Sequence, residues 1–489
     1  MFEAPAIDWY VILPFFLVAG WGVLLMVVDL FVPEDRRTWA PWLTIIGLFA
    51  ALVVSLSQWN NGGGTFTAVG STPMVMVDNF AVFLNVTLLL AGILSLLISI
   101  NFLQGHDLDK PEYYMLMLFS LSGMMLMGMA NDLILVFVAL ELLSIPLYIL
   151  SGFAWPKLKS EESALKYFLL GAFSSSVFVF GIALTYGATG TTSLPQIFEQ
   201  ISVNTALGIG AIAFLLVGLA FKVAAAPFHM WTPDVYEGAP TTATAFMSVG
   251  AKVAGFAALL RIVTVAFPHV GDAWVGAVAI LATLTLIVGN VAAIAQSNIK
   301  RMLAYSSIAH AGYIMIAVAA SANSPDGVSA ALFYMFAYLF SNLGAFAIVI
   351  AMEKRDDEGT ALEDYKGLWQ RSPAMALAMA VFMLSLAGIP PTGGFVGKLF
   401  VFRTAVEANL VWLAVVGVIT AVISAFYYLR VVYFMFMFEG EAQIEAKSAL
   451  RTAVVVMVLV TLLIGVLPGM WFELARQAGL SGMQLLAGG

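Results

Sequence analysis

Long apolar runs, separated by short polar and charged stretches, dominate the pattern of this chain. About 20 consecutive apolar residues suffice for a helix to cross a bilayer. The pattern therefore predicts an all-α polytopic membrane protein with about 14 transmembrane helices. The predicted spans are 9–31, 40–58, 79–103, 112–129, 131–153, 161–187, 207–236, 239–267, 272–296, 299–320, 328–352, 374–406, 410–438 and 449–474.

Two of these spans contain prolines that predict a broken helix. Pro227 interrupts the span 207–236, with His229 just beyond it, and Pro390 and Pro391 interrupt the span 374–406. Proline removes a backbone donor and clashes with the preceding turn, so a helix must kink or break there. Broken membrane helices supply ion sites, because freed backbone groups and bound water gather at the break.

Composition agrees with this class. Of 489 residues, 62% are hydrophobic and 10% are charged, against roughly 25% charged in a soluble domain. The absence of cysteine excludes disulfides and cysteine-ligated metals, and no metal, nucleotide or flavin motif is present. We expect a lipid bilayer around the chain, no cofactor or metal on it and no nucleic-acid partner. The N-terminus lacks the features of a signal peptide, so its first apolar run should remain as a span.

Charges in the loops predict the orientation. With loops numbered alternately, one side holds only Arg476, whereas the other holds thirteen basic residues: Arg36, Arg37, Lys110, Lys157, Lys159, Lys300, Arg301, Lys354, Arg355, Lys366, Arg371, Lys447 and Arg451. Basic residues concentrate in cytoplasmic loops. The bias predicts an even number of spans, with both termini on the outer (periplasmic) side of a bacterial inner membrane. We interpret the loop 353–373 as a solvated connector.

Several ionisable residues fall inside the predicted spans. Arg261, Arg403 and Arg430 lie near span ends, where long side chains can reach the interface. The mid-span residues are Lys222, Lys252, Lys398 and Glu141. A charge at such a depth costs roughly 2.5–3.5 kcal/mol and survives only by facing protein, a partner or water.

Glu141 is the predicted partner of Lys222. Alone in hydrocarbon a carboxyl group would protonate, whereas beside a lysine it would stay ionised. Separating such a pair favours release of the lysine proton, so the pair is a natural proton switch. A static structural ion pair is the alternative.

Two further groups are candidates for the same role. Glu162 and Lys166 are four residues apart, which places them on one helix face in the favourable order. They are either an interfacial pair or a link to the Glu141 and Lys222 region. His310 lies mid-span, and histidine exchanges protons near neutral pH. A hydrogen-bonded core histidine is the alternative interpretation.

A faint internal duplication accompanies the two breaks. Residues 163–168 resemble residues 330–335, five spans later, and an odd offset makes the copies face opposite ways. Interrupted helices at matching places in inverted repeats are the best sequence pointer to a transport path. The predicted organisation is three N-terminal helices (1–110), two inverted five-helix repeats (111–267 and 268–440) and a C-terminal helix (441–489).

Three blocks of sequence carry a resemblance to a known family. They are FKVAAAPFHMW with PDVYEGAP (221–231 and 233–240), KRMLAYSSIAHAGY (300–313) and GIPPTGGF (388–395). These blocks resemble the antiporter-like subunits of proton-pumping NADH–quinone oxidoreductase (respiratory complex I), which share ancestry with Mrp-type sodium/proton antiporters. The length, the fourteen spans, Lys398 in place of glutamate and the lack of a long C-terminal lateral helix resemble the N-type branch.

The resemblance implies roles for individual residues. Glu141 and Lys222 resemble the partners on the fifth and seventh helices of the family, and Lys166 the lysine of the sixth. Lys252 resembles the central lysine of the eighth helix, and Lys398 the lysine of the twelfth, which faces the outer half-channel. We assign His310 to the same path, with Glu162, Pro227, His229, Pro390 and Pro391 supporting it.

The implied function is proton translocation within an enzyme whose redox chemistry lies elsewhere. FMN, iron–sulfur clusters and quinone would belong to other membrane and peripheral subunits of the complex. A subunit of a stand-alone Mrp-type sodium/proton antiporter is one alternative. A membrane scaffold whose buried charges only hold helices together is another.

Overall fold

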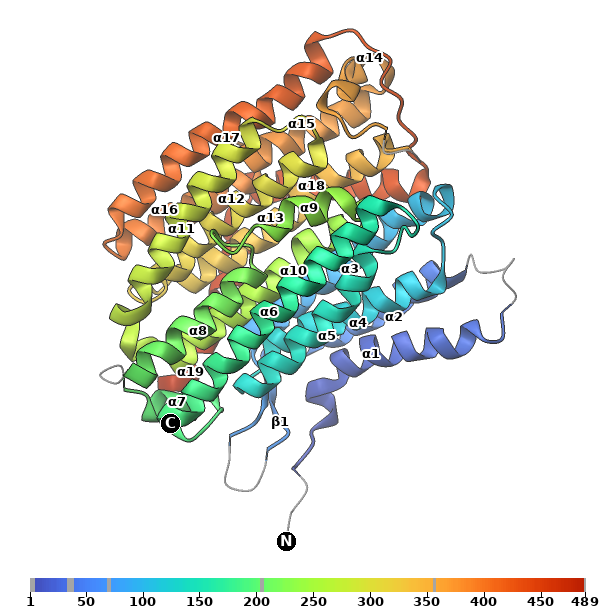
Figure 1. The fold of residues 1–489 in the computed structure, drawn as a ribbon. Coiled ribbons are helices and arrows are strands. Elements are labelled where there is room, and N and C mark those ends of the chain that lie inside the picture. The colour runs from blue at the N-terminus through green and yellow to red at the C-terminus, as the bar shows by residue number, and fades with distance from the viewer. Residues whose placement is uncertain (1–4, 33–38, 68–71, 203–205, 355–357, 488–489) are drawn as a thin grey trace.

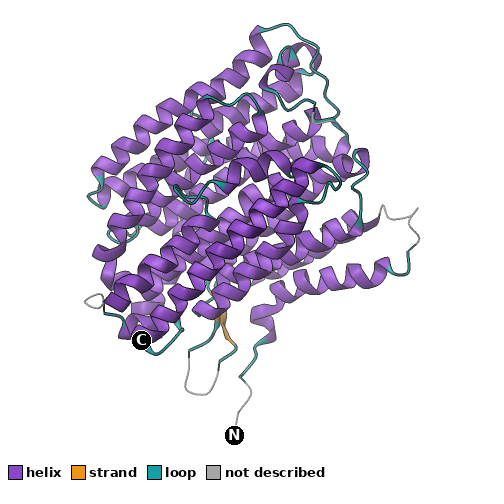
Figure 2. Cartoon of the chain, viewed as in Figure 1, coloured by secondary structure: helices purple, strands orange, loops and turns teal. Residues whose placement is uncertain are grey.

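The computed structural model describes residues 5–32, 39–67, 72–202, 206–354 and 358–487, which form a bundle of long helices (Figure 1). Eleven helices among these residues are long and apolar enough to cross a membrane, and two shorter apolar helices accompany them. Nearly all of the described chain is helical (Figure 2).

The helices in chain order are α1 (Trp9–Asp29), α2 (Ala40–Ser57), α3 (Asn79–Gly105), α4 (Pro111–Met129), α5 (Leu133–Ser151), α6 (Leu158–Thr189), α7 (Leu194–Gln200), α8 (Ala206–Lys222), α9 (Trp231–Gly238), α10 (Thr241–Arg261), α11 (Gly271–Ile294), α12 (Ile299–Ala320), α13 (Gly327–Met352), α14 (Leu368–Arg371), α15 (Pro373–Ala387), α16 (Gly393–Glu407), α17 (Val411–Met437), α18 (Ser448–Val466) and α19 (Pro468–Ala487). A short π-helix, η2 (Ile262–Ala266), follows α10 directly, and η3 (Pro268–Val270) and η4 (Leu362–Tyr365) are short 3₁₀ helices.

Both predicted breaks are present. The first separates α8 from α9 and contains Ala224 with a φ of 61°. The second separates α15 from α16, and Gly388 ends α15 with a φ of 86°. The prolines at 227, 390 and 391 lie within the non-helical segments, as their missing N–H groups require.

One helix forms the centre of the bundle. Every residue of α13 is buried, and α10 and α12 beside it are almost wholly buried. A helix that is apolar all round and buried all round is typical of the interior of a large membrane protein. The flanking helices α6, α11 and α17 expose apolar side chains on one face, including Phe173 (73%) and Val422 (70%). Most polar residues that α10, α12 and α13 carry are therefore enclosed by protein, Arg301 and Tyr305 of α12 being partly exposed.

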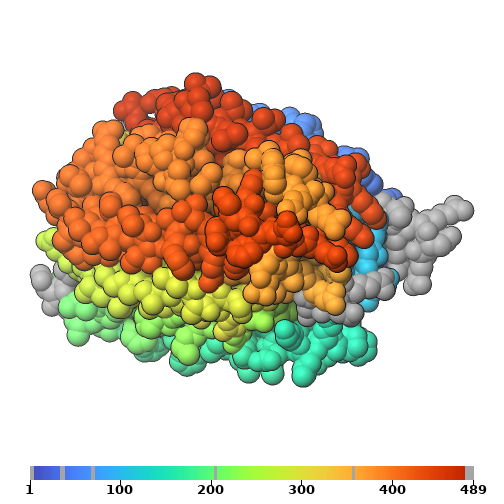
Figure 3. Space-filling view, turned by 90° about the horizontal axis from the view of Figure 1, so that it is seen from above, coloured from blue at the N-terminus to red at the C-terminus, as the bar shows by residue number. Residues whose placement is uncertain are grey.

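Successive parts of the chain lie side by side. In Figure 3 the residues near 150–300 form one side of the molecule and those near 370–480 the other. The start of α1 and the end of α19 lie at one end of the bundle, and α14 lies at the opposite end (Figure 1). We call these ends the terminal end and the α14 end.

Two features differ from the sequence-based expectation. The predicted span 449–474 is divided, because α18 ends at Val466 and α19 begins at Pro468, where proline favours a new helix start. A two-stranded antiparallel sheet, which the all-α prediction lacked, pairs β1 (Gly63–Thr65) with β2 (Val75–Val77).

Arg261 corrects another expectation. It does not extend to the interface: its side chain is 3% exposed, and Nη1 and Nη2 bind Asp78 at 3.1 and 2.8 Å. Nε also donates to the Gly128 carbonyl at 3.0 Å. Asp78 in turn caps α3 by accepting from the Ala81 N–H. A pair this buried is destabilising to break, so it fastens α10 to α3 and α4.

The other two arginines have partners near the helix ends. Arg403 pairs with Glu407 one turn away at 2.7 Å and stays mostly exposed. Arg430 donates to the backbone carbonyls of Ile294 and Gln296 at 3.0 and 2.6 Å. The guanidinium group of Arg430 thus satisfies carbonyls that the end of α11 leaves free.

Candidate functional site

Lys222 is the last residue of α8, at the edge of the first break. Its side chain is buried, and Nζ donates to Ser144 Oγ at 2.7 Å. Ser144 donates its own hydrogen to the Leu140 carbonyl within α5. Ser144 lies three residues after Glu141 on α5. The lysine that binds Ser144 therefore lies near the helix turn that carries the Glu141 carboxylate. Glu141 itself accepts from Ser175 of α6 at 2.5 Å. The structure thus adds two serines that the sequence did not single out. That Glu141 comes within direct or one-water reach of Lys222 in at least one state stays a prediction.

Lys252 lies in the middle of α10 and is 4% exposed. Its Nζ donates to the backbone carbonyl of Ser307 in α12, and the Tyr338 ring lies 5.9 Å from Nζ. The Tyr338 hydroxyl donates to Ser307 Oγ at 3.1 Å. Ser307 therefore links the lysine of α10 to a tyrosine of α13.

His310 lies one turn further along α12. Its Nδ1 is 2.7 Å from the Tyr334 hydroxyl, and its Nε2 is 3.0 Å from the Tyr428 hydroxyl. Tyr428 also hydrogen-bonds Ser306. The Tyr338 ring lies 4.8 Å from the imidazole. His310 is thus held between hydroxyl groups that both donate and accept, the partner type a proton relay needs.

A small cavity of about 10 Å³ adjoins His310. It is lined by residues of α12, α13, α15 and α16, among them Tyr338, Ser341, Ser385 and Leu386. The space is of the order that a single water molecule requires. The cavity lies between His310 and the end of α15, where the next lysine binds.

Lys398 spans the second break. It belongs to α16, yet Nζ donates to the carbonyls of Leu386 and Ala387 at 3.0 and 2.8 Å, the last carbonyls of α15. The Tyr313 ring lies 4.7 Å from Nζ. A cation stabilises the negative end of a helix and satisfies its free carbonyls. The break and the lysine therefore form one unit.

Gly388 makes that arrangement possible. Its φ of 86° is unfavourable for other residues, and a Cβ there would lie 2.7 Å from Lys398 Cδ and 3.3 Å from Nζ. Pro390 and Pro391, just beyond it, are not buried. The backbone conformation therefore favours glycine, and a Cβ there would make the flexible Lys398 side chain shift.

Lys166 lies outside this buried series. It pairs with Glu162, as the spacing predicted, and with Asp234 of α9, both at 2.7 Å, and its side chain is 40% exposed. Asp234 also pairs with Arg301 at 2.8 Å, and Arg301 with Glu237 at 3.0 Å. The pair thus belongs to a larger charge network that joins α6, α9 and α12. The ring of the next residue, Tyr167, lies 5.7 Å from Lys222 Nζ.

The first break reaches the protein surface. Met230 is exposed, and His229 before it is half-buried. The Nδ1 atom of His229 is buried without a hydrogen-bond partner among the described residues. The break is held by a bond from Trp231 Nε1 to the Phe221 carbonyl at 3.2 Å and from the Ala226 N–H to Thr285 Oγ1 at 2.9 Å.

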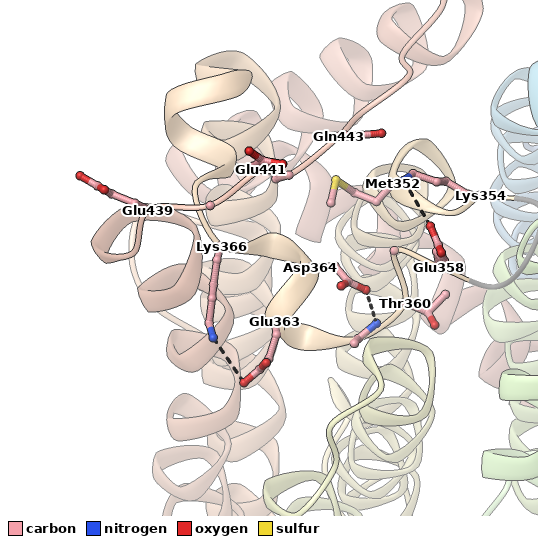
Figure 4. Close-up of a pocket in the computed structure, with 14 residues that line it drawn as sticks. Met352, Lys354, Glu358, Thr360, Glu363, Asp364, Lys366, Glu439, Glu441 and Gln443 are labelled. Atoms are coloured by element: carbon pink, nitrogen blue, oxygen red, sulfur yellow. Dashed lines mark hydrogen bonds and ion pairs between the residues drawn. The ribbon is translucent and has the colours of Figure 1, made fainter.

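Metal binding has no support in the described part of the chain, where no group of three or more His, Asp or Glu side chains converges. A cavity of about 650 Å³ lies near α14 and is lined by acids and two lysines (Figure 4). Lys354 pairs with Glu358 and Lys366 with Glu363, each at 3.3 Å. These charges bind one another and lie apart from the buried lysines.

Two residues expected in loops are in fact buried. Glu353 ends α13 and Lys300 begins α12, and their side chains are 4% and 5% exposed with an N–O distance of 3.6 Å. Glu353 also accepts from Thr241, and Lys300 donates to the Ala239 carbonyl at 3.1 Å. The beginning of the 353–373 loop is therefore not a solvated connector.

Comparison with known proteins gives a consistent answer. Residues 130–424 match the family model described as NADH:quinone oxidoreductase/Mrp antiporter, TM. The chain is 45% identical over 483 residues to NADH-quinone oxidoreductase subunit N of Chloroflexus aggregans, covering 97% of this chain and 98% of that protein.

Solved structures agree. A chain of respiratory complex I from Thermus thermophilus superposes with a TM-score of 0.81 at 36% identity, covering 95% of this chain and 99% of that one. A chain of the Mrp complex from Dietzia sp. gives a TM-score of 0.83 at 22% identity, covering 97% and 98%. The second likeness is one of fold alone.

Proposed function

The chain belongs to the NADH:quinone oxidoreductase/Mrp antiporter family of membrane subunits and is similar along nearly its whole length to subunit N, and from that membership we propose how it moves protons. It is a proton-translocating membrane subunit of NADH–quinone oxidoreductase. We propose that the proton path follows Lys222, Lys252, His310 and Lys398, with Glu141 as the switch beside Lys222.

The observation that carries this proposal is the burial of three lysines against neutral oxygen atoms. Lys222 binds a serine hydroxyl, and Lys252 and Lys398 bind backbone carbonyls. Structural buried charges are usually compensated by an opposite charge, as Arg261 is by Asp78. Lys252 and Lys398, held by backbone carbonyls, can each lose a proton without leaving a carboxylate uncompensated, whereas for Lys222 the proposed switch Glu141 sets that balance. Such intramembrane groups mark proton relays.

The proposed topology has fourteen spans, in which α8 with α9 counts as one broken span and α15 with α16 as another. The N-terminal helices comprise residues 1–110, the inverted repeats 111–267 and 268–440, and the C-terminal helices 441–489. The matched breaks next to Lys222 and Lys398 support the repeats. The loop charges support an α14 end in the cytoplasm and a terminal end outside. FMN, iron–sulfur clusters and quinone belong to other subunits in this proposal, and the membrane is a bacterial inner membrane.

The test is to neutralise the central and distal lysines. Lys252→Ala and Lys398→Ala should each lower NADH-driven proton pumping by about tenfold or more in reconstituted complex, because each removes one protonatable site in series. Assembly is checked by co-purification with the redox subunits. Pumping at the wild-type rate in an assembled variant would remove that lysine from the path. Failure of the wild-type chain to co-purify with NADH dehydrogenase subunits would favour the antiporter outside complex I.

A further inference from the structure

A cavity of about 270 Å³ opens at the α14 end and reaches the buried Lys300–Glu353 pair. Its lining includes His106, Ala154, Lys159 and Pro240 besides the two paired residues. A second cavity of about 410 Å³ reaches Glu353 and His106 from the side of α18. Either volume holds several water molecules. Glu353 is thus a carboxylate that is nearly inaccessible in surface area yet borders two cavities.

His106 supplies an independent sign of water in these cavities. Its Nδ1 is 2.8 Å from the Phe102 carbonyl, and Nε2 is buried without a hydrogen-bond partner among the described residues. A buried polar atom without a protein partner is usually satisfied by ordered water. Since His106 lines both cavities, that water would stand beside Glu353.

From Glu353 a row of hydroxyl groups leads into the bundle along α10. Thr241 donates to the Glu353 carboxylate. Thr244, Ser248 and Lys252 follow at intervals of three, four and four residues, which puts all of them on one helix face. All are buried, and the row covers about 17 Å at 1.5 Å per residue.

The middle of this row has a polar atom that a water could bind. Asn342 of α13 donates Nδ2 to Ser248 Oγ at 2.6 Å, and its Oδ1 is buried without a partner in the described chain. The hydroxyls are one turn apart, so a proton needs water between them, and Asn342 Oδ1 provides an acceptor for such a water.

We propose that Glu353 takes up protons from the cytoplasmic cavity and delivers them along the hydroxyl face of α10 to Lys252. A proton from a hydronium ion in the cavity forms an O–H bond on the carboxylate. For each proton taken up, one proton then leaves Glu353, and its departure restores the carboxylate. It passes through Thr241, intervening waters and Ser248 to a neutral Lys252. Lys300 pairs with Glu353 at the floor of the cavity. Lys159 and Lys447 also line the cavities, but among the described residues neither forms an ion pair with Glu353. This inlet rests on the proposed roles of Lys252 and of the α14 end.

The test uses the assembled complex in proteoliposomes, with NADH and quinone supplied and proton uptake followed by a pH-sensitive dye. Glu353→Gln should lower the pumping rate by about fivefold or more, because the amide cannot take up a proton, and Glu353→Asp should recover a substantial part of it. Glu358→Gln is the matched control: this nearby glutamate has a side chain 68% exposed and pairs with Lys354. It should pump at the wild-type rate.

The possible outcomes distinguish failure of the proposed inlet from failure of the proposed function. If Lys252→Ala loses pumping while Glu353→Gln keeps the wild-type rate, the inlet is wrong and the proposed function stands. If both variants pump normally, the proposed function fails. Equal losses in Glu353→Gln and Glu358→Gln would show a general effect of loop charge and overturn the inlet.

A second measurement does not depend on how Glu353 variants fold. In this cysteine-free chain, Ala154→Cys, which lines the cavity, should react with a charged methanethiosulfonate reagent from the cytoplasmic side. Ala243→Cys, fully buried on α10, is the control and should not react. If the Ala154→Cys thiol does not react, the cavity is not filled with water and the proposed inlet is wrong.

Discussion

Replacing Gly388 by alanine tests whether the second break positions Lys398. Gly388 ends α15 with a φ of 86°, and a new Cβ would lie 2.7 Å from Lys398 Cδ. The Lys398 side chain must then shift, and we expect the shift to disturb the bonds of Nζ to the Leu386 and Ala387 carbonyls. Gly388→Ala therefore acts on the lysine through the backbone beside it, without removing its charge.

The expected cost has two parts. A non-glycine residue in the left-handed region costs roughly 1–2 kcal/mol. Each hydrogen bond from a charged donor is worth about 1.5–3 kcal/mol, and Gly388→Ala threatens two of them. Loss of only one lowers the equilibrium ratio of docked to displaced Lys398 by about tenfold or more, because about 1.4 kcal/mol is a factor of ten. Proton pumping should fall, by at most the factor by which that ratio falls.

Gly190 provides the control for backbone strain. It ends α6 with a φ of 73°, and a Cβ there would meet no atom within 4 Å. Gly190→Ala should thus lower the thermal stability of the complex by the strain alone and leave pumping per NADH unchanged. Both rates are measured in proteoliposomes after assembly is verified. Equal pumping in the two glycine variants would refute the idea that contact between Gly388 and Lys398 matters.

The remaining predictions concern topology and the first break. Ala6→Cys and Arg476→Cys, both at exposed positions, should label with an impermeant maleimide from outside intact cells, and Lys354→Cys should not; labelling of the first two only in inverted vesicles would reverse the orientation. Glu141→Gln and Lys222→Ala should each depress turnover strongly, with a double variant less impaired than the product of the single effects. Independent, multiplicative losses in that double-mutant cycle would mean that the two residues do not act as a unit.

Sequence patterns predicted the breaks and the buried lysines because their signals are local. Proline removes a backbone donor and so favours a helix break, although α1 and α5 continue through Pro14 and Pro146. A lysine within about twenty apolar residues is conspicuous without any knowledge of the fold. The same reasoning paired Glu162 with Lys166, since a spacing of four fixes their separation on a helix.

Contacts between distant segments were beyond such reasoning. Arg261 lies near a span end, which suggested snorkelling, yet Asp78 meets it from 183 residues away. Glu353 stands in a run of charges that resembles a loop, and only the packing of α12 and α10 against α13 buries it. Serine gives no signal in a membrane helix, so Ser144 and Ser307 emerged only as partners of the lysines they bind.

The hydroxyl groups on either side of His310 bear on the speed of a catalytic cycle. Once a proton has passed along Tyr334, His310, Tyr428 and Ser306, every hydrogen bond in that chain points the opposite way, and a second proton must wait until they turn back. A hydroxyl hydrogen turns about a single C–O bond without displacing any heavy atom. Side-chain rotations take picoseconds to nanoseconds, whereas collective helix motions take microseconds to milliseconds. The hydroxyl groups of this segment can therefore reset quickly. The imidazole of His310 cannot, because its N–H has moved from one ring nitrogen to the other, and only a turn of the whole buried ring or a proton passed back restores the first tautomer. Resetting His310 thus belongs with the movements of the lysine side chains and the two helix breaks, in which heavy atoms have to travel.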